Sequence, residues 1–128
     1  RYHREFWEWV PLEVQEEHLR RSQEILQGYF GVPVVTFVPP GNVFTAATLD
    51  LAKRYGLRYV CCNTSQCILQ DQIVMGEEQV VPFHDRDIVM RGITWLQQRL
   101  EEHRGRPFCF VRDLGEALLS SVGAPGSL

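Results

Sequence analysis

His84 is the residue in this sequence best suited to proton transfer near neutral pH. It follows the apolar run Val80–Phe83 directly and has Asp85 as its next neighbour. An unperturbed histidine changes charge close to neutrality, and a carboxylate beside it can stabilise the charged form. Because catalytic side chains of α/β folds gather where parallel strands end, we interpret His84 as a candidate catalytic residue and Asp85 as part of the substrate site. The alternative is a solvated histidine beside a helix N-terminus.

The segment Pro39-Pro40-Gly41-Asn42 follows another apolar run and forms a second candidate site. A glycine in a rigid turn can place its backbone N–H freely, and such an amide can donate to a developing oxyanion. We therefore predict that Gly41 is catalytic and that Pro40 and Asn42 contact the substrate. The same four residues would also serve simply to end a strand.

Trp7 is the candidate for stacking on a sugar ring. It lies with Trp9 in an aromatic segment near the beginning of the chain, and carbohydrate rings stack on aromatic faces. Packing of both rings in the core is the alternative. His3 belongs to the same segment, and a lone histidine there indicates no site by itself.

The four cysteines do not form a recognisable metal motif. Cys62 and Cys67 could be one half of a zinc site, but Cys109 alone does not supply the second pair. We interpret the cysteines as small core residues, since unpaired cysteines are usually buried, with a disulfide and a metal site as the alternatives. Cysteines inside apolar strands favour a reducing compartment, and we expect a cytoplasmic location.

These candidate residues are separated by alternating helix and strand patterns. Amphipathic stretches with capping residues predict helices, and short β-branched or aromatic runs predict strands. The expected apolar stripe of the first helix is Leu12, Leu19, Ile25, Leu26 and Phe30, and that of the third, with Asp87 as its cap, is Val89, Ile93, Leu96 and Leu100. The sequence predicts helices over 11–28, 45–56, 87–105 and 113–119 and strands over 34–38, 57–62, 80–83 and 107–111. Such alternation builds a mainly parallel sheet with helices outside it, so the expected fold class is α/β. Residues 63–79 show no clear pattern.

Length and composition place the chain among single globular domains. It has 128 residues, of which 45% are hydrophobic and 23% charged, with a formal net charge of −3. The acidic balance excludes a broad basic face for nucleic acid, and no apolar run approaches the ~20 residues of a membrane span. We expect one domain over 1–119 and a flexible tail over 120–128. Because the chain opens on dense aromatic residues without an initiator Met, we also expect it to be a fragment.

Four stretches follow one another in an order that matches a known family. They are the helix over 11–28, the strand and turn from Gly31 to Asn42, the segment from Thr45 to Val60, and the strand that ends in His84-Asp85. In order and spacing they resemble the C-terminal half of the polysaccharide deacetylase family, the NodB-homology or chitooligosaccharide deacetylase group. The resemblance covers about residues 3–119.

The resemblance implies a distorted (β/α) barrel, of which this chain would form one part. The family removes acyl groups, chiefly N-acetyl, from carbohydrates and uses a divalent metal, often zinc, held by one Asp and two His. His84 is similar to its general acid, Gly41 to the residue whose N–H holds the oxyanion, and His3 to the second metal-binding histidine. The histidine that pairs with His3 would lie before Arg1, so we expect this chain alone to bind no metal and to be inactive.

Departures from the family leave other functions open. Val38 stands where the family has the Arg of F-R-P-P, no Asp/Trp motif is recognisable over 61–70, and the motif with the catalytic Asp lies before this chain. The first alternative is a catalytically inactive deacetylase-like module for binding or assembly, and the second is an unrelated flavodoxin-like or thioredoxin-like domain. The expected partners are a carbohydrate substrate and a second copy of the chain, because a half-barrel leaves apolar surface uncovered, and the segment with Phe6, Trp7 and Trp9 is the expected contact.

Overall fold

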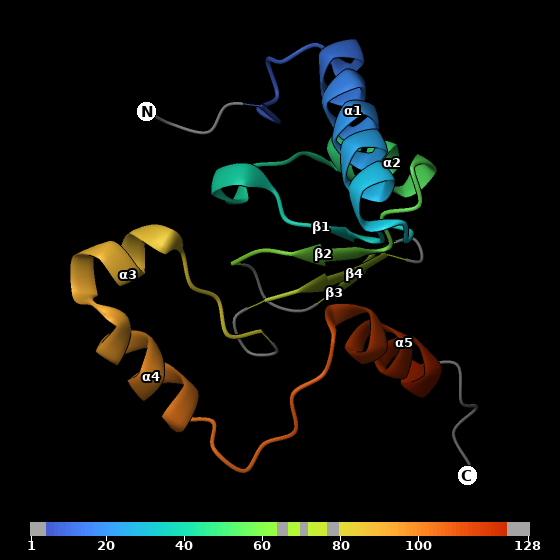
Figure 1. Ribbon diagram of the computed structural model, residues 1–128. Coiled ribbons are helices and arrows are strands. Elements are labelled where there is room, and N and C mark those ends of the chain that lie inside the picture. Colours follow the sequence, from blue (N-terminus) through green and yellow to red (C-terminus); the bar gives the residue numbers. More distant parts are fainter. Residues whose placement is uncertain (1–4, 64–66, 70–71, 77–79, 123–128) are drawn as a thin grey trace, which may run out of the picture.

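The protein is an α/β structure in which helices cover both faces of one sheet (Figure 1). The computed structural model describes residues 5–63, 67–69, 72–76 and 80–122. Its helices are α1 (Leu12–Phe30), η1 (Pro40–Asn42), α2 (Ala46–Arg54), α3 (Asp85–Arg91), α4 (Ile93–Glu101) and α5 (Val111–Val122). Its strands are β1 (Thr36–Phe37), β2 (Tyr59–Cys61), β3 (Cys67–Leu69) and β4 (Gln72–Met75). The α/β class expected from the sequence is confirmed.

The sheet has the strand order β1-β2-β4-β3. β1, β2 and β4 run parallel, with Thr36 opposite Tyr59 and Tyr59 opposite Ile73, and β3 pairs with β4 in the antiparallel direction. The carboxyl ends of the three parallel strands therefore lie at one edge of the sheet. The turn η1, which comes after β1, lies at the edge that faces α3 (Figure 1).

Two of the four predicted strands are wrong. Residues 80–84 and 107–110 are irregular, and the strands that complete the sheet, β3 and β4, come instead from the region 63–79 where no element was expected. Each mispredicted run contains a proline, Pro82 or Pro107, which has no backbone N–H to give to a strand ladder. The apolar character of both runs reflects a cavity that they line.

The helix predicted over 87–105 is two shorter helices. α3 and α4 meet at Gly92, whose φ of 79° is in the left-handed region that glycine adopts at low cost, and α4 ends at Glu101. The residue that caps α3 is His84 rather than Asp87. Similarly, α5 begins at Val111 and continues to Val122, three residues into the segment 120–128 expected to be a tail; residues 123–128 lie outside the described residues.

The expected apolar stripe of the first helix is largely exposed. Along α1 the buried residues are Gln15, Leu19 and Gln23, spaced four apart, whereas Leu12 and Ile25 face away from the core. The helix ends where Gly31, with φ 68°, donates its N–H to the carbonyl of Gln27 at 2.8 Å.

Buried glutamine side chains join α1 to the rest of the fold. Thr48 on α2 donates its hydroxyl to Oε1 of Gln15 at 2.7 Å. Gln23 donates from Nε2 to the carbonyl of Tyr55 at 2.7 Å and to that of Val34 at 3.1 Å. Because buried polar groups are costly unless they are paired, these bonds hold α1 in one position against α2 and the entrance to β1.

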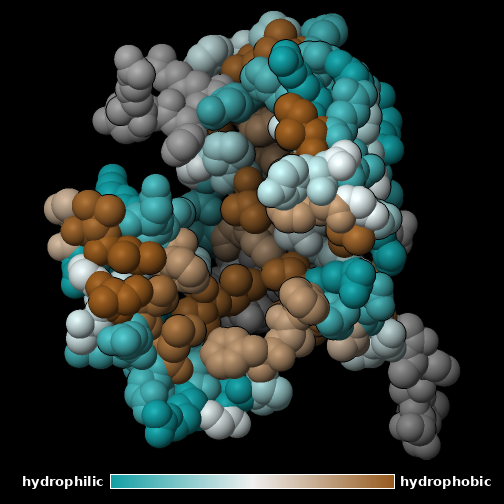
Figure 2. Space-filling model, in the orientation of Figure 1, coloured by the Kyte–Doolittle hydropathy of each residue, from teal (hydrophilic) through white to brown (hydrophobic). Residues whose placement is uncertain are grey.

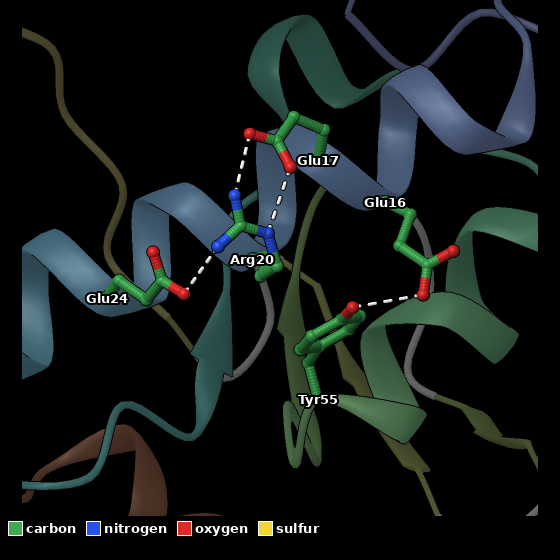
Figure 3. A network of polar contacts seen from close by, with 5 residues as sticks. All are labelled: Glu16, Glu17, Arg20, Glu24 and Tyr55. Atoms are coloured by element: carbon green, nitrogen blue, oxygen red, sulfur yellow. Dashed lines mark hydrogen bonds and ion pairs between the residues drawn. The ribbon is translucent and has the colours of Figure 1, made fainter.

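The outer side of the same helix pair carries charged contacts (Figure 3). The hydroxyl of Tyr55 donates to Oε1 of Glu16 at 3.0 Å, and Arg20 is bound by Glu17 on one side and Glu24 on the other. The carboxylate of Glu16 raises the pKa of Tyr55, because it accepts a hydrogen bond only from the neutral phenol. These exposed pairs contribute little to stability compared with the buried glutamines.

Two apolar clusters lie on opposite faces of the sheet. On the face covered by α1 and α2, Val60 packs in a cluster with Phe6, Leu19, Phe37, Leu49, Leu51, Ala52, Leu57 and Cys62. On the other face, Tyr59 packs against Val35, Val80 and residues of α5. Neighbouring side chains of a strand point to opposite faces, so β2 contributes to both clusters. Within the described ranges, none of the helices combines the length and apolar character that crossing a membrane requires.

Candidate functional site

A cavity of about 830 Å³ lies at the carboxyl end of the parallel strands. Figure 2 shows the hollow between the α3–α4 part and the body of the protein, with apolar side chains gathered on its walls. The wall formed by the strands and by the residues directly after them contains Thr36, Val38, Asn42, Cys61, Cys62 and Asn63. Gly76, directly after β4, also belongs to this wall, and the facing wall contains residues 80–84, Asp87, Arg91, Trp95, Arg99 and Val111.

The cavity brings together two of the residues singled out from the sequence, Asn42 and His84. They are 42 positions apart in the sequence and come from η1 and from the residue before α3. Of the other described candidates, Pro40 and Gly41 lie in η1 directly before Asn42 but do not line the cavity, nor does Asp85.

Two further candidates lie elsewhere. Trp7 precedes α1 and stacks at a tilt on Trp9, with 6.4 Å between the ring centroids, and it does not line the cavity. His3 lies outside the described residues.

The turn after β1 has an uncommon backbone. Gly41 and Asn42 both adopt left-handed conformations, with φ of 62° and 59°. Asn42 is one of the few residue types that tolerate this region, and its Oδ1 accepts the backbone N–H of Asn63 at 3.1 Å. This bond ties the end of β1 to the end of β2. The hydrogen bonds that close the turn use the amides of Asn42 and Val43, so neither engages the N–H of Gly41.

His84 is held at the cavity by its backbone. Its N–H donates to Oδ2 of Asp87 at 2.9 Å, and the N–H of Asp87 donates to the carbonyl of His84 at 3.0 Å. The imidazole itself is exposed. Asp85, the expected acidic neighbour, instead accepts the N–H of Arg86 on Oδ1 at 2.7 Å. The carboxylate that shares the cavity with His84 is therefore that of Asp87.

Three cavity residues were missed by the sequence analysis: Arg91, Trp95 and Arg99. Together with Asp87 they recur every four positions in the sequence, and they line the cavity from two helices, Asp87 and Arg91 from α3 and Trp95 and Arg99 from α4. The expected core stripe of this segment is mostly exposed, with Val89 at 82%. The sequence signal for a site was the stripe of Arg91, Trp95 and Arg99, because a tryptophan between two arginines is unusual on a helix face that only contacts solvent.

Two cysteines, Cys61 and Cys62, also border the cavity. Cys62 is buried, as expected for a core cysteine, and Cys61 is half-buried. Burial, and to a smaller degree the neighbouring Cys62, raise the pKa of the Cys61 thiol, so it stays protonated near neutral pH. Cys109 is an exposed free thiol rather than a core residue, and the side chain of Cys67 lies outside the described residues.

A metal site does not form from the described residues alone. Across 5–63, 67–69, 72–76 and 80–122, no three His, Cys, Asp or Glu side chains come close enough together to hold an ion. A protein zinc site needs at least three such ligands. The described residues therefore do not fit a resident metal, and we derive no chemical step through one.

The cavity combines the features of a site for a polar organic ligand. It has apolar walls for a ring, amides for hydrogen bonds, an exposed imidazole and two guanidinium groups. Concave sites of this volume with a few converging polar groups are the usual places where small molecules bind. No protein-family model, curated protein or solved structure matches the chain.

Proposed function

We propose that this chain belongs to a polysaccharide deacetylase-like hydrolase, which removes acyl groups, chiefly N-acetyl, from a carbohydrate. The single observation that carries the proposal is that Asn42 and His84 line one cavity at the carboxyl ends of parallel strands. If the chain is built like the family that its sequence resembles, the turn with Asn42 and the segment that ends at His84 should meet at the active site. Catalytic groups of sheets of this kind gather at that edge.

Two groups of the chain would act on the substrate directly. The imidazole of His84, in its protonated form, would donate a proton to the amine that leaves as the amide bond breaks. Water would add to the acyl carbon and lose its proton to the family's catalytic Asp, which has no counterpart among the residues of this sequence, and the backbone N–H of Gly41 would donate to the oxygen of the resulting tetrahedral intermediate. The left-handed turn supports this role, because the hydrogen bonds that close it leave the N–H of Gly41 unused, one residue before Asn42, which lines the cavity.

We further propose that the sheet is one part of a distorted (β/α) barrel. The support is its row of three parallel strands, with β1 at an edge where a further parallel strand could pair. Barrels of this kind continue such a row until the sheet closes, with α1 and α2 on the outside; α5, which packs on the other face of the sheet, would lie outside that regular pattern.

The exposed apolar side chains support self-association of the chain. Tyr29 and Phe30 at the end of α1 are exposed and stack edge to face, and Trp9, just before α1 in the sequence, is exposed as well. Large apolar groups of this kind commonly mark interaction surfaces. Sedimentation at tens of micromolar, roughly the range of weak dimers, should show dimers or larger species, and a monodisperse monomer would refute this point.

A catalytically inactive binding module is the second candidate, and one residue favours it. Val38 lines the cavity and is 66% exposed at the position where the family carries an arginine. An apolar side chain cannot supply the charge that orients a catalytic base. A protein that binds acylated sugars but releases no acid from them would identify this module.

Acetate release from N-acetylglucosamine oligomers decides between the hydrolase and the binding module. It is measured for the protein as its gene encodes it, with and without added zinc. Replacing His84→Ala should lower turnover by roughly 10²–10⁴-fold, the usual size of a general-acid contribution. The matched control is His18→Gln, an exposed histidine on α1 that lies outside the cavity and should leave turnover unchanged. Full activity of the His84 variant would refute its role, and no acetate release from the unaltered protein would refute the hydrolase.

A further inference from the structure

The described residues that line the cavity carry a net charge opposite in sign to that of the chain. Among the described lining residues, Arg91 and Arg99 carry full positive charges and Asp87 is the one carboxylate. An adjoining cavity of about 420 Å³ shares Val80, Val81, Phe83 and Val111 with the first and adds Arg106 without adding a described carboxylate. The whole chain has a net charge of −3. A concave surface that gathers cations on an acidic protein concentrates anions.

Arg91 is held ready for a ligand by its neighbours. Its Cζ lies 5.0 Å from the ring centroid of Trp95, over the face of the ring, and its Nε lies 4.0 Å from Oδ1 of Asp87. The ring and the carboxylate fix the plane of the guanidinium, but 4.0 Å is too long for a hydrogen bond. Neither of these contacts uses the terminal nitrogens of the guanidinium, which remain available to a carboxylate or a phosphate.

Arg99 provides a second cation one helical turn beyond Trp95. Its Nη1 reaches Oε2 of Glu102 at 3.2 Å, and Glu102 does not line the cavity. An arginine has five N–H donors, so this single exposed contact leaves most of its donors unused. The two arginines belong to the same wall of the cavity, Arg91 at the end of α3 and Arg99 on α4, and each can form charge-assisted hydrogen bonds with an anion.

The opposite wall of the cavity is uncharged and has three polar side chains beside Val38 and the two cysteines. It presents the amides of Asn42 and Asn63 and the hydroxyl of Thr36. Such groups exchange hydrogen bonds with hydroxyl groups and carry no charge that would attract a free ion. The two walls together fit a molecule with hydroxyl groups on one side and a negative charge on the other.

We propose that this cavity binds a carbohydrate that carries a carboxylate or phosphate group, and that Arg91 and Arg99 hold this group by charge-assisted hydrogen bonds. Trp95 acts as a positioning residue that fixes the plane of Arg91. The inference rests on the proposed carbohydrate ligand and adds the charge that the ligand must carry. It also assigns a role to the α3–α4 segment, which the deacetylase chemistry does not use.

Four probes test the proposal by calorimetric titration of the full chain at constant ionic strength. They are N-acetylglucosamine, N-acetylglucosamine 6-phosphate, N-acetylmuramic acid and inorganic phosphate. A hydrogen bond to a charged group strengthens binding by about tenfold or more. At least one acidic sugar should therefore bind about tenfold more tightly than the neutral sugar and about tenfold more tightly than inorganic phosphate. Whichever of the two acidic sugars binds more tightly shows whether the site recognises phosphate or carboxylate.

Each other outcome overturns a distinct statement. Equal affinity for the neutral and acidic sugars refutes the anion site and leaves the proposed deacetylase standing. Equal affinity for inorganic phosphate and the acidic sugars shows that the site recognises an ion alone, which refutes the carbohydrate part. Binding of an acidic sugar without acetate release in the activity assay refutes the hydrolase and not the anion site. No binding of any probe refutes the inference.

Variants assign the effect to the named residues. Arg91→Gln and Arg99→Gln should each weaken binding of the acidic sugar by about tenfold and leave the neutral sugar unaffected. Arg86→Gln is the matched control, since Arg86 lies on α3 but outside both cavities. Trp95→Phe should retain most of the affinity and Trp95→Leu should lose it. Arg91→Lys keeps the charge but not the planar fork, so its affinity for the acidic sugar should lie between those of the unaltered protein and of Arg91→Gln. An equal loss of affinity in the Arg86→Gln control would overturn the assignment.

Discussion

Gly115 on α5 lies directly against the ring of Tyr59 on β2. A Cβ placed at position 115 would collide with Cδ1 and Cε1 of that ring and would lie 3.0 Å from its Cζ. The absence of a side chain at 115 therefore sets how closely α5 approaches the sheet. Tyr59 is 1% exposed, and its ring is the centre of the apolar cluster on this face.

We expect Gly115→Ala to destabilise the protein although alanine is the better helix former. Overpacking of a close contact costs about 1–3 kcal/mol, which exceeds the roughly 1 kcal/mol that alanine gains over glycine in a helix. Urea unfolding followed by circular dichroism measures the difference. The control is Gly28→Ala in α1, where nothing lies within 4 Å of the new Cβ. That variant should be unchanged or more stable, and an equal loss in both variants would contradict the contact.

Replacement of Asn42 should separate its backbone role from its side-chain role. Asn42→Gly keeps the left-handed conformation and loses only the bond to the N–H of Asn63, whereas Asn42→Ala loses both. Because the left-handed region costs a residue with a Cβ about 1–2 kcal/mol, the alanine variant should be less stable than the glycine variant by about that amount. Thermal unfolding of the two variants measures it. Equal stability would show that the turn relaxes to another conformation.

The hydrogen bond between Tyr55 and Glu16 predicts a pH dependence. It raises the pKa of Tyr55 above its ordinary value of 10.0, so the bond stabilises the fold below that pH. This contribution is lost as pH rises through the pKa of Tyr55 in the folded protein. Glu16→Gln should lower the pKa of Tyr55 in an NMR titration of ring-labelled tyrosine. Glu13→Gln, one turn earlier on the exposed side of α1, should leave the pKa of Tyr55 unchanged.

Several elements could be predicted because their causes are local. The capping residue Thr45 and the turn at Gly56 bound α2, and Gly31 ends α1 within a few residues of the predicted end. The Pro-Pro-Gly-Asn segment forms the turn expected of it, since two prolines and two residues tolerant of positive φ leave few other conformations. The α/β class followed from the alternation of these elements.

The rest depended on contacts between distant parts of the chain. The run 80–83 has the apolar composition of a strand, but in the fold it lines a cavity, and β4 takes the place beside β2. Apolar composition predicts that a segment is shielded from water, but it does not predict which part of the protein the segment packs against. The stripe Arg91, Trp95 and Arg99 has the pattern of a solvated helix face until the ends of β1 and β2 are placed opposite it. The sequence by itself therefore determined most of the helices, the turn after β1 and the fold class, because short-range sterics and hydrogen bonds decide these. Only the tertiary structure decided that Asn42, His84 and the two arginines share one cavity, because their proximity arises from strand pairing and helix packing across tens of residues.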